Sequence, residues 1–187
     1  LPALELVPSS RGDKQVALVL VPTRELAMQV SEAFFRYGKE MGARCVPVYG
    51  GQPIFRQLQA LERGVNIVVG TPGRVIDHIG RGSMPLDAVR MVVLDEADEM
   101  LDMGFAEDIE SILEAIPHAH QTVLFSATMP PRINAIAKRY QNDPVRINVV
   151  RGDTKASTGK VRQIAYVVPR SHKPAALGRV LDRKSTR

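Results

Sequence analysis

Several classes of protein are excluded by what this sequence lacks. It contains a single cysteine, Cys45, so an internal disulfide bond cannot form. Tryptophan is absent and aromatic residues make up only 5% of the chain, which leaves few rings to stack on nucleic-acid bases. No apolar run is long enough to span a bilayer, and residues 1–6 lack the basic start and long apolar core of a signal peptide. We therefore expect a cytoplasmic protein that does not interact with membranes.

The composition is that of a globular protein with a modest excess of basic residues. Its 187 residues, 44% of them hydrophobic, suit one domain and part of another. Lys and Arg number 25 against 20 acidic residues, which gives a net charge of +5. This excess favours polyanion partners, but a mixed solvated surface explains it equally well.

Strand and helix patterns alternate along most of the chain. Short apolar runs are followed by segments in which apolar residues recur at helical spacing. This alternation predicts an α/β fold in which helices cover both faces of a parallel sheet. The predicted strands are 16–21, 44–48, 66–70, 92–94, 122–125 and 145–149, and the predicted helices lie within 30–41, 54–61, 74–79, 105–116 and 133–140.

The last part of the chain predicts a change of domain. Residues 151–160 are polar and rich in Gly, Ser and Thr, as in a linker. A strand pattern at 161–168 and a helix pattern at 175–181 follow, and these are too short to bury a core of their own. We expect one domain over 1–149, a linker over 150–160, and the beginning of a second domain over 161–187.

A polar or glycine-rich cluster follows each of the first five predicted strands. Since the carboxyl ends of parallel strands share one edge of the sheet, where ligands bind, these clusters should lie together. Each alone has an ordinary explanation as a helix cap, a turn or a solvated loop, but the five together indicate a functional edge. The clusters are 22–27, 50–51, 71–74, 95–98 and 126–128.

The chemistry of these clusters suits a nucleotide and a polyanion. Asp95 directly follows an apolar strand, where a carboxylate is well placed for Mg²⁺ and its phosphates, and Glu96 could activate a water. The other clusters offer helix starts, glycines and arginines that suit phosphate groups. These phosphate-binding candidates are Thr23, Arg24, Gly50, Gly51, Thr71, Gly73 and Arg74.

In this order, the clusters closely resemble the motifs of the DEAD-box family of ATP-dependent RNA helicases. Residues 22–27 match PTRELA, 50–51 match GG, 71–74 match TPGR, 95–98 match DEAD and 126–128 match SAT. The resemblance covers residues 1–149 and is strongest to bacterial members. It implies that this part is the first RecA-like domain of a two-domain helicase core, with ATP and Mg²⁺ as cofactors.

The resemblance also implies roles for individual residues. Glu96 and Asp95 would be catalytic, with Asp95 holding Mg²⁺ through water. Asp98 would hydrogen-bond the loop of Ser126, Ala127 and Thr128 and couple the nucleotide state to domain closure. The protein would be a monomer that opens RNA duplexes locally, gripping the backbone without sequence preference. The implied RNA-binding residues are Pro22, Thr23, Arg24, Gly50, Gly51, Thr71, Pro72, Gly73 and Arg74.

One departure from the family is important. The phosphate-binding loop G-x-x-x-x-G-K-[ST] and the Gln motif of the family are not in this sequence, and its one G-K pair, at 159–160, is followed by Val161. We therefore expect a fragment of an ATP-dependent RNA helicase that alone is inactive as an ATPase. Two alternatives stay open: an ATPase-dead RNA-binding module, and a helicase that acts on DNA.

Overall fold

The computed structural model describes residues 2–7, 14–149 and 164–182. The predicted linker at 150–160 and the start of the predicted strand at 161–168 lie outside these residues. The elements are α1 (Pro2–Glu5), β1 (Ala17–Leu20), α2 (Arg24–Gly38), η1 (Lys39–Met41), β2 (Cys45–Val48), α3 (Ile54–Glu62), β3 (Ile67–Gly70), α4 (Pro72–Gly80), β4 (Met91–Leu94), α5 (Ala97–Asp102), α6 (Ala106–Glu114), β5 (Gln121–Leu124), α7 (Pro131–Tyr140), η2 (Arg170–His172) and α8 (Lys173–Asp182).

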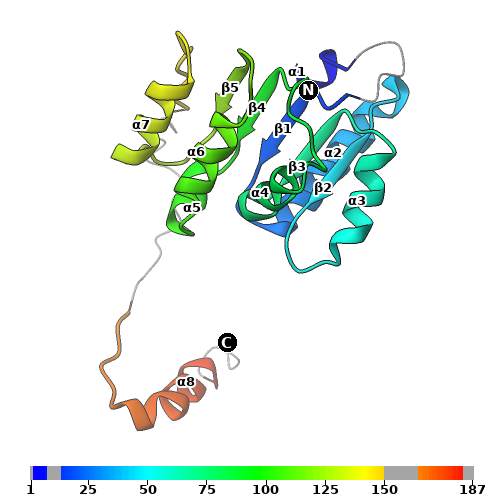
Figure 1. Ribbon diagram of the computed structural model, residues 1–187. Helices are drawn as coiled ribbons and strands as arrows, with labels where there is room; N and C mark the ends of the chain where they lie inside the picture. The colour runs from blue at the N-terminus through cyan, green and yellow to red at the C-terminus, as the bar shows by residue number, and fades with distance from the viewer. Residues whose placement is uncertain (1, 8–13, 150–163, 183–187) are drawn as a thin grey trace. The chain divides into compact units, whose positions relative to one another are not determined.

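The strands form one parallel sheet in the order β2-β3-β1-β4-β5 (Figure 1). Every neighbouring pair is parallel, so the sheet class predicted from the sequence is confirmed. The last residue of β1, Leu20, is in register with Gly70 of β3 and Leu94 of β4. The strands therefore end level with one another, and the loops after them leave from the same edge.

The side chains of β1 alternate between two separate apolar cores. Leu18 and Leu20 face the core that is covered by α3, α4, α5, α6 and α7, and both are fully buried. Ala17 and Val19 face the core that contains Leu4 of α1 and Phe34 of α2. This two-residue alternation follows from strand geometry, and it confirms helices on both faces of the sheet. Burying one such leucine contributes roughly 1.5–3 kcal/mol, so the centre of the sheet is its most stable part.

The outer strand β5 is less buried than the central ones. Its residues are exposed or half-buried, and the Thr122 hydroxyl is buried without a hydrogen-bond partner in the described part of the chain. Predicted strand 145–149 is wrong: these residues form no strand, and Val145, Ile147 and Val149 are 87%, 81% and 87% exposed. Their alternating pattern is strand-like, but a strand also needs a neighbour to accept and donate its hydrogen bonds.

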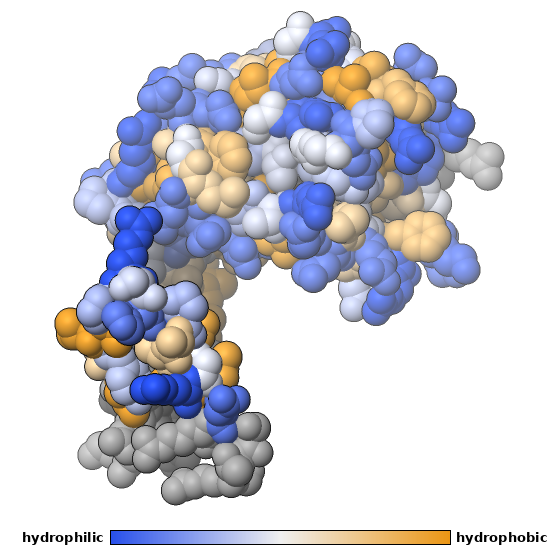
Figure 2. All heavy atoms as spheres, turned by 90° about the horizontal axis from the view of Figure 1, so that it is seen from below, coloured by the Kyte–Doolittle hydropathy of each residue, from blue (hydrophilic) through white to orange (hydrophobic). Residues whose placement is uncertain are grey.

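Internal contacts divide the chain into one unit of Leu1–Val145 and another of Arg146–Arg187. In the second unit, α8 contains the predicted helix 175–181, whereas the described residues 164–168 form no strand. The predicted domain limits at 149 and 161 stay predictions. Within the described ranges, no helix is both long and apolar enough to cross a membrane. The face seen in Figure 2 is mainly hydrophilic, with its apolar side chains in small separate groups.

Candidate functional site

All five sequence clusters lie along the carboxyl edge of the sheet. The strand order places the clusters at 50–51, 71–74 and 22–27 on the consecutive strands β2, β3 and β1. The acidic cluster 95–98 and the cluster 126–128 follow β4 and β5. Neighbouring strands are about 4.8 Å apart, so the two groups lie side by side. We call the first group, 50–51, 71–74 and 22–27, the phosphate-binding half after the chemistry expected of it, and the second group, 95–98 and 126–128, the acidic half.

The acidic half begins with a sharp turn between β4 and α5. The Asp95 N–H donates to the Leu20 carbonyl at 3.0 Å, which continues the sheet by one residue. Glu96 then takes φ 51° and ψ 50°, a left-handed conformation that costs a residue with a side chain roughly 1–2 kcal/mol. Ala97 is fully buried, and its N–H donates to the Phe125 carbonyl at 3.0 Å. The turn is therefore fixed at both ends, and it leaves the Glu96 side chain exposed to solvent.

Asp98 joins the acidic turn to the loop after β5. Its Oδ2 atom accepts from the Thr128 hydroxyl at 2.8 Å and from the Thr128 N–H at 2.9 Å, and its own N–H donates to the Ser126 hydroxyl at 3.2 Å. Burial raises the pKa of Asp98, but the hydrogen bonds from Thr128 and Ser126 outweigh this effect and lower the pKa to about 2. Asp98 is therefore ionised at neutral pH. These hydrogen bonds agree with the sequence resemblance, while the coupling role of Asp98 stays a prediction.

The acidic half offers Mg²⁺ a single point of attachment rather than a cage. Among the described residues, no group of three or more His, Cys, Asp or Glu side chains could hold a metal ion. The Asp95 Oδ1 atom accepts from the Glu96 N–H at 3.0 Å, which fixes the orientation of this half-buried carboxylate. Because protein-bound Mg²⁺ usually keeps several waters and binds one or two carboxylates and substrate phosphates, Asp95 fits a water-mediated contact.

The two threonines of the phosphate-binding half differ in what their side chains do. Thr23 is the N-cap of α2, and its hydroxyl accepts from the Leu26 N–H at 3.2 Å. Thr71 is the N-cap of α4 and Pro72 occupies the first helical position, but the Thr71 hydroxyl makes no capping hydrogen bond. Thr23 is thus a structural cap as well as an RNA-binding candidate, and the Thr71 hydroxyl is not used in capping.

The remaining candidates on this half range from exposed to buried. Arg24 is exposed and forms an ion pair with the neighbouring Glu25 at 2.5 Å. Pro22 and Pro72 are buried, so they shape the backbone rather than offer side chains to a ligand. The ion pair of Arg24 holds its guanidinium only weakly, because exposed ion pairs between neighbours contribute little.

The glycines at this edge leave open space in front of the backbone. A Cβ atom added at Gly50 or Gly51 would meet no atom within 4 Å, and one added at Gly73 would meet only the Asp108 Oδ2 atom, at 3.8 Å. Gly51 has a φ of 79°, which disfavours any other residue there. At Gly50 and Gly73 the fold itself would accept a methyl group, so a requirement for glycine would come from a ligand.

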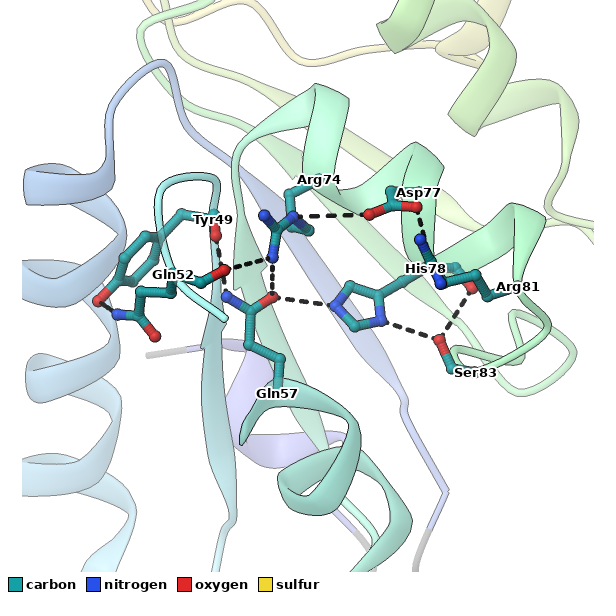
Figure 3. Close-up of polar contacts among 8 residues, drawn as sticks. All are labelled: Tyr49, Gln52, Gln57, Arg74, Asp77, His78, Arg81 and Ser83. Atoms are coloured by element: carbon teal, nitrogen blue, oxygen red, sulfur yellow. Dashed lines mark hydrogen bonds and ion pairs between the residues drawn. The ribbon is translucent and has the colours of Figure 1, made fainter. Parts of the chain in front are cut away.

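Arg74 is held firmly, with its side chain only 16% exposed. Its Nη1 donates to the Gln52 carbonyl at 3.3 Å and to Gln57 Oε1 at 3.4 Å, and its Nε lies 3.7 Å from Asp77 Oδ2 (Figure 3). Within the described residues no hydrogen bond involves its Nη2 group. Arg74 can therefore offer Nη2 to a phosphate while the rest of the guanidinium is fixed.

Two buried residues at this site, Gln57 and His78, were not predicted from the sequence. His78 is fully buried and hydrogen-bonded to Gln57, which is 3% exposed. The two residues lie 21 positions apart on different helices. The one available clue was that Gln57 falls among the apolar residues Ile54, Leu58 and Leu61 of a helix.

Comparison with known proteins identifies the family. Residues 1–136 match the family model described as DEAD/DEAH box helicase. A DEAD-box ATP-dependent RNA helicase CshA from Bacillus licheniformis is 50% identical over 169 residues, which is 90% of this chain and 34% of that protein. A protein of the same name from Bacillus cereus is 46% identical and aligns with 99% of this chain and 35% of its own length. The chain thus spans about a third of the length of these relatives.

Solved structures agree with this assignment. A DEAD box protein from Methanococcus jannaschii has a TM-score of 0.66 and 44% identity, over 76% of this chain and 38% of that one. A hypothetical ATP-dependent RNA helicase from Sulfolobus tokodaii has a TM-score of 0.69 and 38% identity, over 76% of this chain and 40% of that one. The five-stranded parallel sheet with helices is the RecA-like fold of these proteins. The chain belongs to the DEAD/DEAH box helicase family.

Proposed function

We propose that this chain is the RNA-gripping and water-activating part of an ATP-dependent RNA helicase. Family membership and the names of its relatives support this activity class. The observation that carries the proposal is the division of one sheet edge into a phosphate-binding half and an acidic half. A polymer with a phosphate backbone can lie on the first half while a nucleotide phosphate meets the second.

On the acidic half, the exposed Glu96 carboxylate is the proposed base that takes a proton from the attacking water. Asp95, with one oxygen fixed by the Glu96 N–H, would hold Mg²⁺ through a water molecule. When bound, the ion supplies charge that stabilises the phosphates during transfer. Asp98 would transmit the state of this turn to Ser126, Ala127 and Thr128, because its carboxylate and backbone already bond to that loop.

On the other half, RNA would be held through its phosphates and not through its bases. The candidates are backbone N–H groups at two helix starts, open glycine backbone and two guanidinium groups, all of which suit phosphate and none of which reads sequence. The proposed contact residues are Pro22, Thr23, Arg24, Gly50, Gly51, Thr71, Pro72, Gly73 and Arg74. Binding should therefore be similar for different sequences and should weaken steeply as salt is raised.

Three glycine substitutions test this surface. Gly50→Ala and Gly73→Ala add a methyl group where the fold has room, and Gly80→Ala does the same at the end of α4, outside the clusters. We expect the first two variants to bind a fluorescein-labelled oligouridylate about tenfold more weakly, which corresponds to about 1.4 kcal/mol. Gly80→Ala should bind as the unchanged chain does. The measurement is fluorescence anisotropy, with urea unfolding as the check on folding.

The proposal would be overturned if the unchanged chain did not bind the oligouridylate at low salt. If all three glycine variants bound the oligouridylate equally well, RNA would not lie against Gly50 and Gly73, and the predicted surface would be wrong. The alternative of a helicase that acts on DNA is tested with an unlabelled deoxyuridine oligomer as competitor. Competition as effective as that of the ribose oligomer would favour a DNA substrate, since the 2′-OH is what distinguishes RNA at such a site.

A further inference from the structure

A chain of hydrogen bonds, buried at its centre, joins the loop after β2 to helices α3 and α4 (Figure 3). Gln57 of α3 is at its centre: its Nε2 donates to the Tyr49 carbonyl at 2.9 Å, and its Oε1 lies 3.0 Å from His78 Nε2. On the other side of the ring, His78 Nδ1 lies 2.8 Å from the Ser83 hydroxyl. His78 is fully buried, and a buried polar group of this kind is costly unless it is hydrogen-bonded.

The partners of Gln57 fix its orientation and the protonation of His78. The Tyr49 carbonyl can only accept, so the amide nitrogen of Gln57 must face it and the amide oxygen must face His78 and Arg74. His78 must therefore carry a proton on Nε2. In the neutral ring Nδ1 accepts, so the Ser83 hydroxyl donates to Nδ1 at 2.8 Å rather than to the His78 carbonyl, which lies 3.1 Å away. Burial, and then the nearby Arg74 charge, lower the pKa of His78, and Asp77 only partly opposes them. The lowered pKa favours the neutral ring, with its proton on Nε2.

The same chain of bonds fixes both ends of the glycine loop and Arg74 together. Gln57 binds the carbonyl of Tyr49, immediately before Gly50, and Arg74 binds the carbonyl of Gln52, immediately after Gly51. The Tyr49 hydroxyl and the Gln52 side chain add a further hydrogen bond across the loop. Since Gln57 also accepts from Arg74, the loop after β2 and the arginine after β3 are joined through one amide.

We propose that Gln57 and His78 are positioning residues that hold Arg74 and the Gly50–Gly51 loop in one phosphate-binding geometry. Neither residue touches RNA in this proposal, which rests on the proposed function. Gln57 sets the distance between the two clusters, and His78, together with the Tyr49 carbonyl, holds Gln57 in its orientation. The competing explanation is that the bonds only stabilise the fold, so the test must separate affinity from stability.

A double-mutant cycle makes this separation. Gln57→Met keeps the size of the side chain and removes its hydrogen bonds, and Arg74→Ala removes the guanidinium. We expect each single variant to bind a fluorescein-labelled oligouridylate about five- to tenfold more weakly, the effect of about one charge-assisted hydrogen bond. In the Arg74→Ala background, Gln57→Met should cost less than it does in the unchanged chain, because only its contact with the Tyr49 carbonyl remains to be lost.

A conservative variant and the salt dependence provide the second readout. Gln57→Glu can still accept from Arg74 and His78 but gives up the bond to the Tyr49 carbonyl, so we expect it to recover the part of the affinity that depends on Arg74. Gln57→Met should also lower the slope of log affinity against log salt towards that of Arg74→Ala, by about one. A variant that is merely less stable would leave the salt slope unchanged, and its effect on affinity would multiply with that of Arg74→Ala.

The proton position on His78 is measured without RNA. Long-range nitrogen–proton NMR spectra of the histidine rings should show the neutral Nε2–H form of His78 in the unchanged chain and lose it in Gln57→Met. The Nδ1–H form in the unchanged chain would overturn the proposal, since Gln57 could then not bond to His78 and Arg74 together.

The outcomes separate this proposal from the function on which it rests. If the unchanged chain does not bind the oligouridylate, both fail. If Arg74→Ala weakens binding but Gln57→Met does not, or if their effects multiply fully, the positioning role is overturned and the RNA-binding surface stands. Non-additive losses with rescue by Gln57→Glu support both.

Discussion

Asp98 shows how a single side chain connects segments that are far apart in the sequence. Its carboxylate receives two hydrogen bonds from Thr128, 30 positions away. The charge of Asp98 strengthens these bonds, and their presence keeps its pKa at about 2. The loop after β5 is thereby attached to the turn after β4 through an ionised group, which makes the attachment sensitive to acid.

Replacing Asp98 should reveal this sensitivity. Asp98→Ala should lower the free energy of unfolding by roughly 1–3 kcal/mol at neutral pH, whereas Asp102→Ala, at the exposed end of α5, should change it by less than about 0.5 kcal/mol. The folded-state pKa lies below the ordinary value of about 3.9, so the contribution of Asp98 is complete above that value and is lost as pH falls towards about 2. Urea unfolding of both variants at several pH values measures this, and equal stability at neutral pH would contradict it.

The residues of the candidate site differ in how far the sequence could predict them. Asp98, Ser126 and Thr128 belong to short motifs whose order along the chain already indicated a shared edge. Gln57 and His78 could not be found in this way. Their hydrogen bond joins two helices, and a contact between single polar residues leaves no periodic pattern in the sequence.

Helices α6 and α7 are joined at the surface by ion pairs and fixed from beneath by apolar side chains. Arg139 lies 2.7 Å from Glu114 and stands over the Tyr140 ring, with its side chain 59% exposed. Ile133 of α7 and Ile109 of α6 are both fully buried in the same core. Exposed ion pairs contribute little, so the core should decide whether these helices stay in place.

Truncations on the two sides of α7 test this expectation. Ile133→Ala should lower the free energy of unfolding by about 2–5 kcal/mol, because it removes buried methylene groups and leaves a cavity. Arg139→Ala should lower it by less than about 1 kcal/mol. Urea unfolding followed by circular dichroism compares the two variants at moderate salt. A larger loss for Arg139→Ala than for Ile133→Ala would show that the ion pairs, and not the core, hold α7.

At this scale the sequence predicted most elements, and its errors have physical causes. The five strands of the sheet were predicted to within two residues at each end, because β-branched runs bounded by polar clusters are a strong signal. Helix α5 was missed, since six residues with three acidic side chains show no apolar periodicity. The strand prediction for 145–149 was wrong because a strand needs a neighbouring strand for its hydrogen bonds as well as a suitable pattern of its own.

The strand order is a property of the whole molecule that the sequence did not predict. Alternating strands and helices require a parallel sheet, but they do not say that β1 lies between β3 and β4. This placement brings the three phosphate-binding clusters onto consecutive strands, with the acidic turn on the next strand, β4. The division of the edge into two halves thus comes from chain topology rather than from any one motif.

The ATPase activity of the whole chain should reflect the absence of a phosphate-binding loop. With no G-x-x-x-x-G-K-[ST] loop among its 187 residues, it lacks the backbone N–H groups and lysine that cradle the phosphates of ATP. We expect no RNA-stimulated release of phosphate from ATP by this polypeptide. The assay compares the chain with Glu96→Gln, which removes the proposed general base, because loss of such a base lowers rates by about 10²–10⁴-fold. Release that Glu96→Gln abolishes would contradict this expectation.

The left-handed backbone at Glu96 has an evolutionary consequence. Glycine would adopt this conformation with less strain, so a change to glycine there would relieve stress in the turn. Selection for thermostability alone would remove the glutamate. A protein that retains it accepts a small, permanent loss of stability, which its two buried cores must offset. Heat-tolerant variants chosen only for survival of the fold should therefore accumulate changes at position 96, and variants chosen for catalysis should not.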